Sequence, residues 1–442
     1  MTYKIDTQTI NDLRIVVKSG GDDIYSFFNK TLTQGGASAL NNMFLNPFSN
    51  ESDIRTRKNC IRYFTESQFQ FSFNVKLFGS ISYYLSNCDE RTRISKKHTT
   101  TGQKLEYKLG LDQEYRKLKK GVLNTLTFLY ELKEFWKEIQ PSEGDRYKIE
   151  ELHRINEILS MQEFHVVTSL KKRPKNLSFS KIAYFDELFR FTVNAELMIL
   201  IQHVDKVDAF ISVAKVAREN KLAFAEIEED RENCIELDQA YHPLIANAIA
   251  NTIEVDENSN MIFLTGANMA GKSTFLKTFG IAVYLAHMGF PVPAKSMRFS
   301  VQNGMMTTIN LSDNLGMGLS HFYAEVKRVK EVIERINGNE RITVVFDELF
   351  RGTNVKDAYD ATIAVADIFS QVKNCIFIIS THIIEVGDVL KEKRENIKFK
   401  YLPTIMKDNI PHYPYKIKDG ITDDRHGMLI INNEGVFDIL NT

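Results

Sequence analysis

A glycine-rich stretch that follows an apolar run constrains the fold more than any other feature of this sequence. It runs from Gly266 to Ser273 in the pattern GxxxxGKS, within TGANMAGKST (265–274). The apolar run MIFL (261–264) precedes it, and the helical pattern FLKTFGIAVYLAH (275–287) follows it. Backbone N–H groups of such a loop cradle phosphates, and the following helix directs its positive end at them. The sequence therefore predicts a strand–loop–helix unit that binds a nucleotide.

Four side chains supply the chemistry that such a loop requires. Lys272 is expected to reach the β- and γ-phosphates, and Ser273 to offer its hydroxyl to Mg²⁺. Asp347 and Glu348 end a second apolar run, ITVVFDE (342–348). A carboxylate at the end of a strand can hold Mg²⁺ through its water shell, so this role is predicted for Asp347. Glu348 is predicted to accept a proton from the attacking water; the alternative is that both carboxylates only cap the next turn.

Two more candidates lie at the ends of expected elements. His382 follows the apolar run CIFIIST (375–381) and is predicted to sense or position the γ-phosphate, whereas a lone histidine is otherwise structural. Ser320 begins a helical stretch after Gly316 and Gly318. A serine at a helix start forms an anion site together with the free N–H groups, and the alternative is a simple helix cap.

The pattern of apolar residues divides the chain into two parts. Residues 1–240 are helical in character, as in the stretches 118–139 and 207–224, where apolar side chains recur at helical spacing. After residue 240, short β-rich runs alternate with helical patterns, which favours a mainly parallel sheet. The predicted fold class is α plus α/β, with a helical domain at 1–240 and an α/β domain at 241–442.

Composition excludes several classes of protein. Of 442 residues, 43% are hydrophobic and 26% charged, which is typical of globular chains. Four scattered cysteines indicate neither a disulfide framework nor a zinc site. The amino terminus lacks the layout of a signal peptide, and no apolar run reaches the ~18 residues of a membrane span. We therefore expect a soluble, cytoplasmic protein.

Basic residues concentrate in one segment of a chain that is otherwise balanced, with 56 basic and 57 acidic residues. Residues 91–120 hold ten Lys and Arg against three Asp and Glu, and KKRPK (171–175) is a second basic cluster. The segment predicts either a solvated surface or a contact with a phosphate backbone. Its candidate contact residues are Arg91, Arg93, Lys96, Lys97 and Lys104.

These motifs resemble those of the MutS family of DNA mismatch-repair ATPases. TGANMAGKST is similar to that family's TGPNMGGKST, and DELFRGTNVKDA (347–358) is similar to its DEIGRGTSTYDG. STH (380–382) resembles ATH, YHP (241–243) resembles RHP, and DNLGMGLSHF (313–322) resembles DDLASGRSTF. Residues 5–13, 31–48 and 207–220 are similar, with less specific motifs, to the family's helical core and lever.

The resemblance implies an ABC-type P-loop ATPase domain after a helical core and lever domain, with ATP and Mg²⁺ as ligands. It implies catalytic roles for Glu348, His382 and Lys272, and metal binding by Ser273 and Asp347. In the family the counterpart of Ser320 contacts ATP on the partner subunit, which implies a homodimer. The implied nucleotide-binding residues are Gly266, Ala267, Asn268, Met269, Ala270, Gly271, Lys272, Ser273, Thr274, Ser320 and His242.

The departures from the family are equally specific. The core begins near residue 5, so we expect neither the mismatch-reading domain nor the connector domain, and the clamp is expected to be short or absent. Nothing after the ATPase motifs resembles the usual dimerisation helices. The position of the aromatic residue that stacks on adenine in the family is taken by Ala248 or Ile249.

The sequence thus predicts a MutS-like ATPase that works as a dimer and binds branched or unusual DNA without recognising mismatches. Repair or recombination proteins are possible partners, and no membrane association is expected. The alternative is an ATP-controlled dimeric switch whose helical half binds a protein. A transport or SMC-type ATPase fits less well, because LSGGQ is absent and only about 75 residues separate Lys272 from Asp347.

Overall fold

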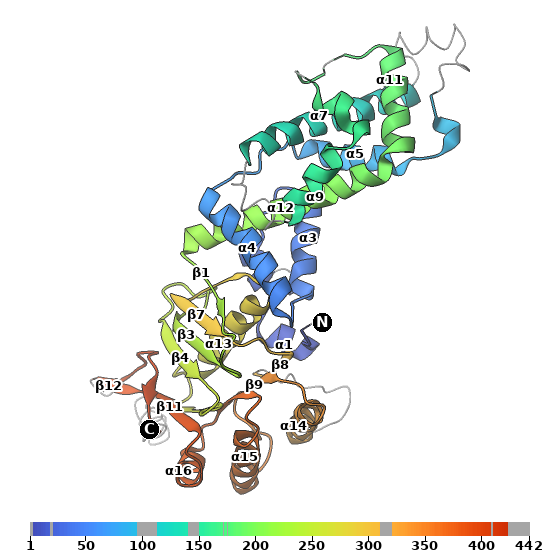
Figure 1. Cartoon of the computed structure of the whole chain (residues 1–442). Helices are drawn as coiled ribbons and strands as arrows, with labels where there is room; N and C mark the ends of the chain where they lie inside the picture. Colours follow the sequence, from blue (N-terminus) through green and yellow to red (C-terminus); the bar gives the residue numbers. More distant parts are fainter. Residues whose placement is uncertain are drawn as a thin grey trace, which may run out of the picture. The chain divides into compact units, whose positions relative to one another are not determined.

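The chain folds into two compact units, each described here by itself (Figure 1). Unit 1 comprises Met1–Phe28, Met43–Lys58 and Val216–Thr442, and unit 2 comprises Asn29–Asn42 and Asn59–Lys215. The computed structural model describes residues 3–17, 21–94, 113–139, 150–170, 172–174, 176–309, 321–407 and 410–422.

Within the described residues, the main sheet of unit 1 has six strands in the order β14-β11-β5-β10-β9-β8. Every neighbouring pair is parallel except β11 and β14. The predicted mainly parallel sheet is therefore confirmed, and three of its strands occupy the apolar runs singled out from the sequence. In chain order the strands are β5 (Met261–Gly266), β8 (Gly304–Thr308), β9 (Ile342–Phe346), β10 (Ile376–Ser380), β11 (Ile397–Leu402) and β14 (Lys418–Asp419).

Three helices cover one face of this sheet: α14 (His321–Asn337), α15 (Val355–Ser370) and α16 (Ile384–Lys393) (Figure 1). Alternate residues of the strands, such as Phe263 and Phe377, point into a core that these helices close. Phe346, Phe369 and Phe377 stack in this core, with ring centroids 6.3 Å and 4.8 Å apart. The strands are continuous hydrophobic runs because both faces of a parallel sheet are buried.

Helix α13 (Lys272–His287) occupies the other side and is buried along most of its length. It packs against β5 and also against β3, a strand of the second sheet, whose order is β2-β7-β3-β4. The strands of the second sheet are β2 (Glu226–Ile227), β3 (Ile235–Ala240), β4 (Asn251–Val255) and β7 (Ser296–Phe299). Two short pairs complete the strands described in unit 1: β1 (Ala223–Phe224) with β6 (Pro291–Val292), and β12 (Ile405–Lys407) with β13 (Ile410–His412).

The amino-terminal segment belongs to unit 1, although the sequence places it in the helical half. Lys4 forms a parallel bridge with Gly304, which begins β8. In helix α1 (Thr7–Asp12), the Asp12 carboxylate accepts hydrogen bonds from the Thr307 hydroxyl at 2.7 Å and the Ile309 N–H at 2.9 Å. The units thus divide the chain differently from the boundary predicted at residue 240, because this segment packs on the edge of the main sheet. Helix α2 (Ile24–Phe28) also lies in unit 1.

Unit 2 is helical, as the spacing of apolar residues predicts. Residues 118–138 of the first predicted stretch lie in α7, and residues 207–220 of the stretch 207–224 lie in α12. The end of the second stretch was predicted wrongly, because Ala223 and Phe224 form β1. The helices that lie wholly in unit 2 are α5 (Lys76–Ser86), η1 (Glu90–Thr92), α7 (Gln113–Glu138), α9 (Glu150–Leu159), η2 (Gln162–Phe164), α10 (His165–Thr168), α11 (Phe179–Asp186) and the π-helix η3 (Glu187–Thr192). Helices α3 (Gln34–Leu45), α4 (Glu51–Ser67) and α12 (Asn194–Asn220) contribute residues to both units.

A buried ion pair organises the interior of unit 2. The Arg190 guanidinium donates to Asp186 and to the Thr92 hydroxyl, and the Tyr84 hydroxyl donates to the same carboxylate at 2.8 Å. Burial, followed by the charge of Asp186, raises the pKa of Tyr84. Because each charge has hydrogen-bonding partners, the pair fixes η1 relative to α11 instead of leaving a buried charge unsatisfied.

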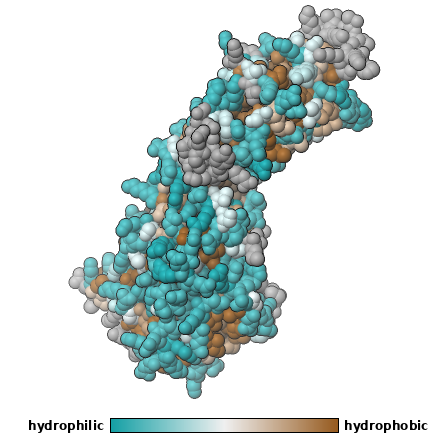
Figure 2. Space-filling model, in the orientation of Figure 1, coloured by the Kyte–Doolittle hydropathy of each residue, from teal (hydrophilic) through white to brown (hydrophobic). Residues whose placement is uncertain are grey.

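The side of the molecule seen in Figure 2 is mostly hydrophilic. Within the described ranges, none of the helices is both long enough and apolar enough to cross a bilayer.

His287 is a completely buried titratable group of unit 1. Its Nδ1 lies 2.8 Å from the Val283 carbonyl oxygen, and its Nε2 accepts the Gln302 N–H at 3.0 Å. A carbonyl only accepts, so Nδ1 must carry the proton and Nε2 must be bare. Burial lowers the pKa of His287 to about 4. The native structure therefore requires a neutral imidazole.

Acidification is expected to destabilise the protein through His287. Its folded-state pKa lies below the unfolded value of 6.5, so its contribution to stability is complete above pH 6.5 and is lost as the pH falls through about 4. At about 1.4 kcal/mol per pKa unit, the loss reaches about 3 kcal/mol. Urea unfolding between pH 7 and pH 4 measures it. His287→Gln should flatten the dependence and the exposed-site control His412→Gln should retain it; equal slopes in both would contradict this account.

Candidate nucleotide-binding site

The phosphate-binding loop predicted from the sequence connects β5 to α13. Gly271 precedes the helix with φ = +100°, a conformation that favours glycine, and a Cβ there would meet the Tyr415 ring at 3.0 Å. At Gly266 a Cβ would lie 3.0 Å from the Leu402 carbonyl oxygen. The two glycines thus allow the backbone to turn sharply and to approach its neighbours closely. The loop leaves its N–H groups at the amino end of a buried helix.

Lys272 lies folded over this loop. Its ammonium donates to the carbonyl oxygens of Gly266 at 2.9 Å and Ala267 at 3.3 Å, and lies 3.7 Å from Glu348 Oε1. The side chain is only 5% exposed. A cation held beside the loop in this way can neutralise phosphate oxygens that bind to the same N–H groups.

Asp347 follows β9 and accepts hydrogen bonds on both carboxylate oxygens. The Ser273 hydroxyl donates to Oδ2 and the Ser380 hydroxyl to Oδ1. Burial raises the pKa of Asp347, the two hydroxyls oppose this effect, and the neighbouring Glu348 adds to it. A carboxylate and a hydroxyl are hard oxygen donors of the kind that Mg²⁺ prefers, so Ser273 and Asp347 fit the metal that was predicted for them.

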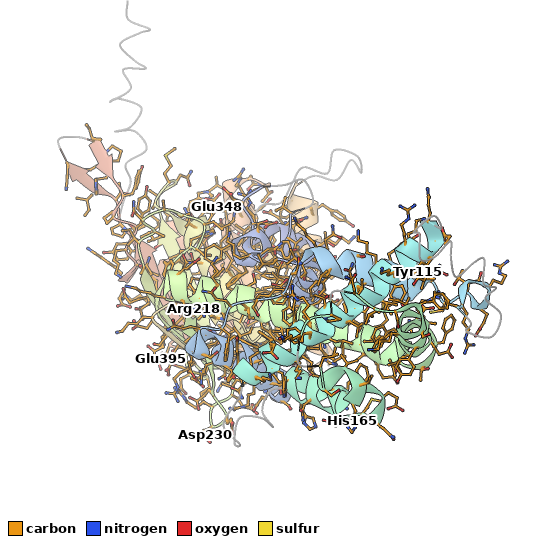
Figure 3. All side chains as sticks on the ribbon, turned by 90° about the horizontal axis from the view of Figure 1, so that it is seen from above. Tyr115, His165, Arg218, Asp230, Glu348 and Glu395 are labelled. Carbon is orange, nitrogen blue, oxygen red and sulfur yellow. The ribbon has the colours of Figure 1, made fainter. Side chains whose placement is uncertain are left out.

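Glu348 lies beside Lys272 on the wall of the same cavity and is labelled in Figure 3. Its backbone has φ = +52°, and its N–H donates to the Ser380 carbonyl oxygen at 3.0 Å. Arg351 Nη1 lies 3.4 Å from its Oε2. Left-handed backbone at a residue other than glycine is costly and concentrates at functional sites, which supports a chemical role for this side chain.

A cavity of about 560 Å³ extends from the phosphate-binding loop over the segment that precedes β4. Its lining includes the apolar side chains of Ile245 and Ile249. Both residues considered for the adenine-stacking position, Ala248 and Ile249, line the cavity. Of the predicted nucleotide-binding residues, the lining includes His242, Ala267, Asn268, Met269, Gly271, Lys272, Ser273 and Thr274.

Tyr415 also lines this cavity and was not found from the sequence. Asn251, which also lines the cavity, holds the segment of Tyr415 in place: the Asn251 amide donates to the Tyr415 carbonyl oxygen at 2.9 Å and accepts the Ile417 N–H at 2.8 Å. The only signal in the sequence is the aromatic stretch PHYPYKI (411–417), which lies far from the loop along the chain. The half-exposed ring gives the cavity an aromatic surface.

His242 is held in its neutral form. Its Nδ1 accepts the Leu244 N–H at 3.3 Å. Burial, then the charges of Lys277 and Arg14, lower its pKa to about 4. It therefore contributes no positive charge to the cavity near pH 7.

The remaining predicted residues are distributed as follows. Ala270 is buried within the loop, and Gly266 forms its first residue. His382 follows β10, is exposed, and lies outside the group of described residues that line the cavity. Ser320 lies outside the described residues, and α14 begins with the residue that follows it. Asp357 caps α15 together with Asn354, whose side-chain oxygen accepts the Asp357 N–H at 2.9 Å.

A phosphate-binding loop between β5 and α13, with a carboxylate pair at the end of β9, defines an ABC-like P-loop nucleotide-binding domain. Residues 262–439 match the family model described as MutS domain V. The predicted resemblance to the MutS family is thereby confirmed over these residues.

Curated relatives named "DNA mismatch repair protein MutS" support the same conclusion. The protein of Persephonella marina is 28% identical over 239 residues, which is 53% of this chain and 27% of that protein. The protein of Leuconostoc mesenteroides is 28% identical over 335 residues, or 72% and 38% of the two chains. The protein of Aquifex pyrophilus is 28% identical over 306 residues, or 67% and 33%. The chain thus spans about a quarter to two fifths of the length of these relatives.

Phe350 departs from the motif that the segment resembles, which has glycine at this position. Its backbone has φ = +63°, in the left-handed region that favours glycine. The ring is buried and lies 5.9 Å from that of Phe322 in the first turn of α14, measured between centroids. Packing of the ring therefore offsets an unfavourable backbone conformation two residues after Glu348.

Two variants of Phe350 separate the stabilisation by its buried ring from the cost of its left-handed backbone. Phe350→Ala should lose about 3–5 kcal/mol of unfolding free energy. Phe350→Gly loses the same ring but relieves a left-handed cost of about 1–2 kcal/mol, so it should be about 1 kcal/mol more stable than Phe350→Ala. Urea denaturation measures both values.

Phe377 on β10 provides the matched control, because its ring is buried in the same core but its backbone is an ordinary strand. There the glycine variant should be less stable than the alanine variant. If the alanine variant were the more stable at Phe350 too, Phe350 would carry no backbone strain.

Proposed function

We propose that this protein binds and hydrolyses ATP together with Mg²⁺, and that it works as a dimer that binds branched or unusual DNA. The observation that carries the proposal is the convergence of Lys272, Ser273, Asp347 and Glu348 on one cavity edge. One cation, two carboxylates and a hydroxyl are not needed together to stabilise a fold at this position. They are the groups that transfer of a phosphoryl group to water requires.

The phosphates bind to the loop N–H groups, and Lys272 turns from the carbonyl oxygens of the loop to the phosphate oxygens. Ser273 and Asp347 hold the metal, which neutralises charge that develops on the phosphate oxygens when it is bound. Glu348 orients the attacking water and accepts its proton. The adenine base packs against Tyr415 and Ile249, which line the same cavity.

Hydrolysis should depend on Glu348. Glu348→Gln keeps the size of the side chain but removes the proton acceptor, so turnover should fall by about 10²- to 10⁴-fold while ATP still binds. Steady-state phosphate release and equilibrium nucleotide binding measure the two effects. Arg351→Gln, which removes the cation beside Glu348, is the matched control and should retain most of the activity. Turnover at the wild-type rate in Glu348→Gln would remove Glu348 from this role.

The exposed apolar side chains around the site favour a dimer. Met269 in the loop and Val355 at the start of α15 are 81% and 73% exposed. Large apolar groups that are exposed in this way can be covered by a protein interface. A two-fold dimer would cover them and bring Ser320 of each subunit to the ATP of the other. Light scattering of Glu348→Gln with ATP reports the assembly: a dimer supports the proposal, and a monomer contradicts it.

The DNA contact is proposed for the basic residues of unit 2. Within 91–120, Arg91 is paired with Asp89, and Arg93 with Glu90 and Glu187, so these two cations are partly neutralised. Lys96, Lys97 and Lys104 lie outside the described residues. In the first turns of α7, beside Tyr115 (labelled in Figure 3), three cations have no acidic partner in the part of the chain that the structure describes: Arg116, Lys119 and Lys120.

Replacement of Arg116, Lys119 and Lys120 by Gln should weaken binding to duplex, forked and four-way DNA alike. Contacts with phosphates are independent of sequence, so each lost contact should also reduce the slope of log K against log salt by about one. ATP turnover without DNA should not change.

The matched control removes three exposed lysines from unit 1, namely Lys373, Lys391 and Lys393. It should leave the affinity for DNA unchanged. If both triple variants behave like the wild type, the basic segment is a solvated surface, and the ATP-controlled switch that binds a protein partner becomes the favoured function.

A further inference from the structure

Ser380 lies at the carboxyl end of an interior strand of the main sheet, where the candidate site is located. It is the last residue of β10, which lies between β5 and β9 in parallel register, with Ser380 opposite Leu264 and Ile379 opposite Phe346. The residue that follows Phe346 is Asp347, so Ser380 lies directly beside the carboxylate. Ser380 is completely buried. Its hydroxyl therefore needs a partner within the protein.

That partner is Asp347. The Ser380 hydroxyl donates to Asp347 Oδ1, while Ser273 donates to Oδ2 from the other side. The Glu348 N–H points at the same serine, 3.0 Å from its carbonyl oxygen and 3.3 Å from its hydroxyl oxygen. One buried side chain thus contacts the proposed metal ligand and the backbone of the proposed base.

We infer that Ser380 is a positioning residue of the magnesium site. An aspartate carboxylate rotates easily about its last bond, and a donor fixed on one oxygen removes this freedom. With Oδ1 held by Ser380, Oδ2 faces Ser273 and the space between the strand end and the phosphate-binding loop. Mutation of a residue that holds a metal ligand by a hydrogen bond typically lowers metal affinity about 10- to 100-fold. The inference rests on the proposed function.

The hydroxyl is not needed for the strand itself. The motif that STH resembles has alanine at this position, and β10 forms its backbone ladder with β5 and β9 without any side-chain contribution. The hydroxyl is therefore an addition of this chain, and its bond to Asp347 is the feature that Ser380→Ala removes.

The test measures metal binding and not turnover alone. Mn²⁺, followed by electron paramagnetic resonance, replaces Mg²⁺ as the probe and is titrated into the full chain with ADP. Ser380→Ala should bind Mn²⁺ about 10-fold more weakly than the wild type, whereas its affinity for ADP in EDTA should not change. The matched control is Ser370→Ala on α15: Ser370 is also completely buried, but its hydroxyl donates to the Asp367 carbonyl oxygen at 2.8 Å.

The outcomes distinguish a failure of the role inferred for Ser380 from a failure of the proposed function. If Ser380→Ala binds Mn²⁺ like the wild type, or loses affinity for ADP in EDTA to the same extent as for Mn²⁺, Ser380 is not a positioning residue. The same conclusion follows if Ser370→Ala weakens Mn²⁺ binding equally. If the wild type binds neither ADP nor Mn²⁺, the proposed function itself fails, and this inference fails with it.

Discussion

The parallel pairing of β10 with β5 on one side and β9 on the other is the constraint on which the site depends. It aligns Ser380 with Leu264 and brings the carboxyl ends of the three strands to one edge. Residues that follow different strands then meet there, although about 75 positions separate Lys272 from Asp347. A register shift of one residue would turn Ser380 to the other face and separate it from Asp347.

Charge is concentrated at this edge in groups that are largely withdrawn from water. Lys272 is 5% exposed and the Glu348 side chain 19%, and they lie 3.7 Å apart. Burial raises the pKa of Asp347, while hydroxyls on both of its oxygens stabilise the charged form. In the proposed reaction Lys272 turns toward the phosphate, whereas Asp347 is already held by its two hydroxyl partners.

Much of this could be predicted from the sequence, because the signals are local. A glycine-rich loop between an apolar run and a helical pattern identifies the phosphate site, and carboxylates at the end of an apolar run identify the metal and base candidates. The three strands, the mainly parallel sheet and the helical character of unit 2 follow from apolar spacing alone.

The features that the sequence did not reveal depend on contacts between distant segments. Tyr415 lines the cavity because hydrogen bonds with Asn251 hold its segment there. Phe350 adopts a backbone that its residue type disfavours because a buried ring holds it. The segment with Asp12 joins unit 1 by hydrogen bonds to β8, some 295 positions away. No local pattern encodes such contacts, since they are decided by tertiary packing.

The central claim is that the carboxyl ends of the strands in the main sheet form an ATP site in which Lys272 contacts the phosphates. Calorimetric titration with ATP and Mg²⁺ tests this claim most directly. The account predicts one nucleotide bound per chain, and a marked loss of affinity in Lys272→Ala, because the lost group is a cation that neutralises phosphate charge. The exposed lysine variant Lys391→Ala on α16 should bind like the wild type. Absence of binding by the wild type, or equal affinity in Lys272→Ala, would contradict the account.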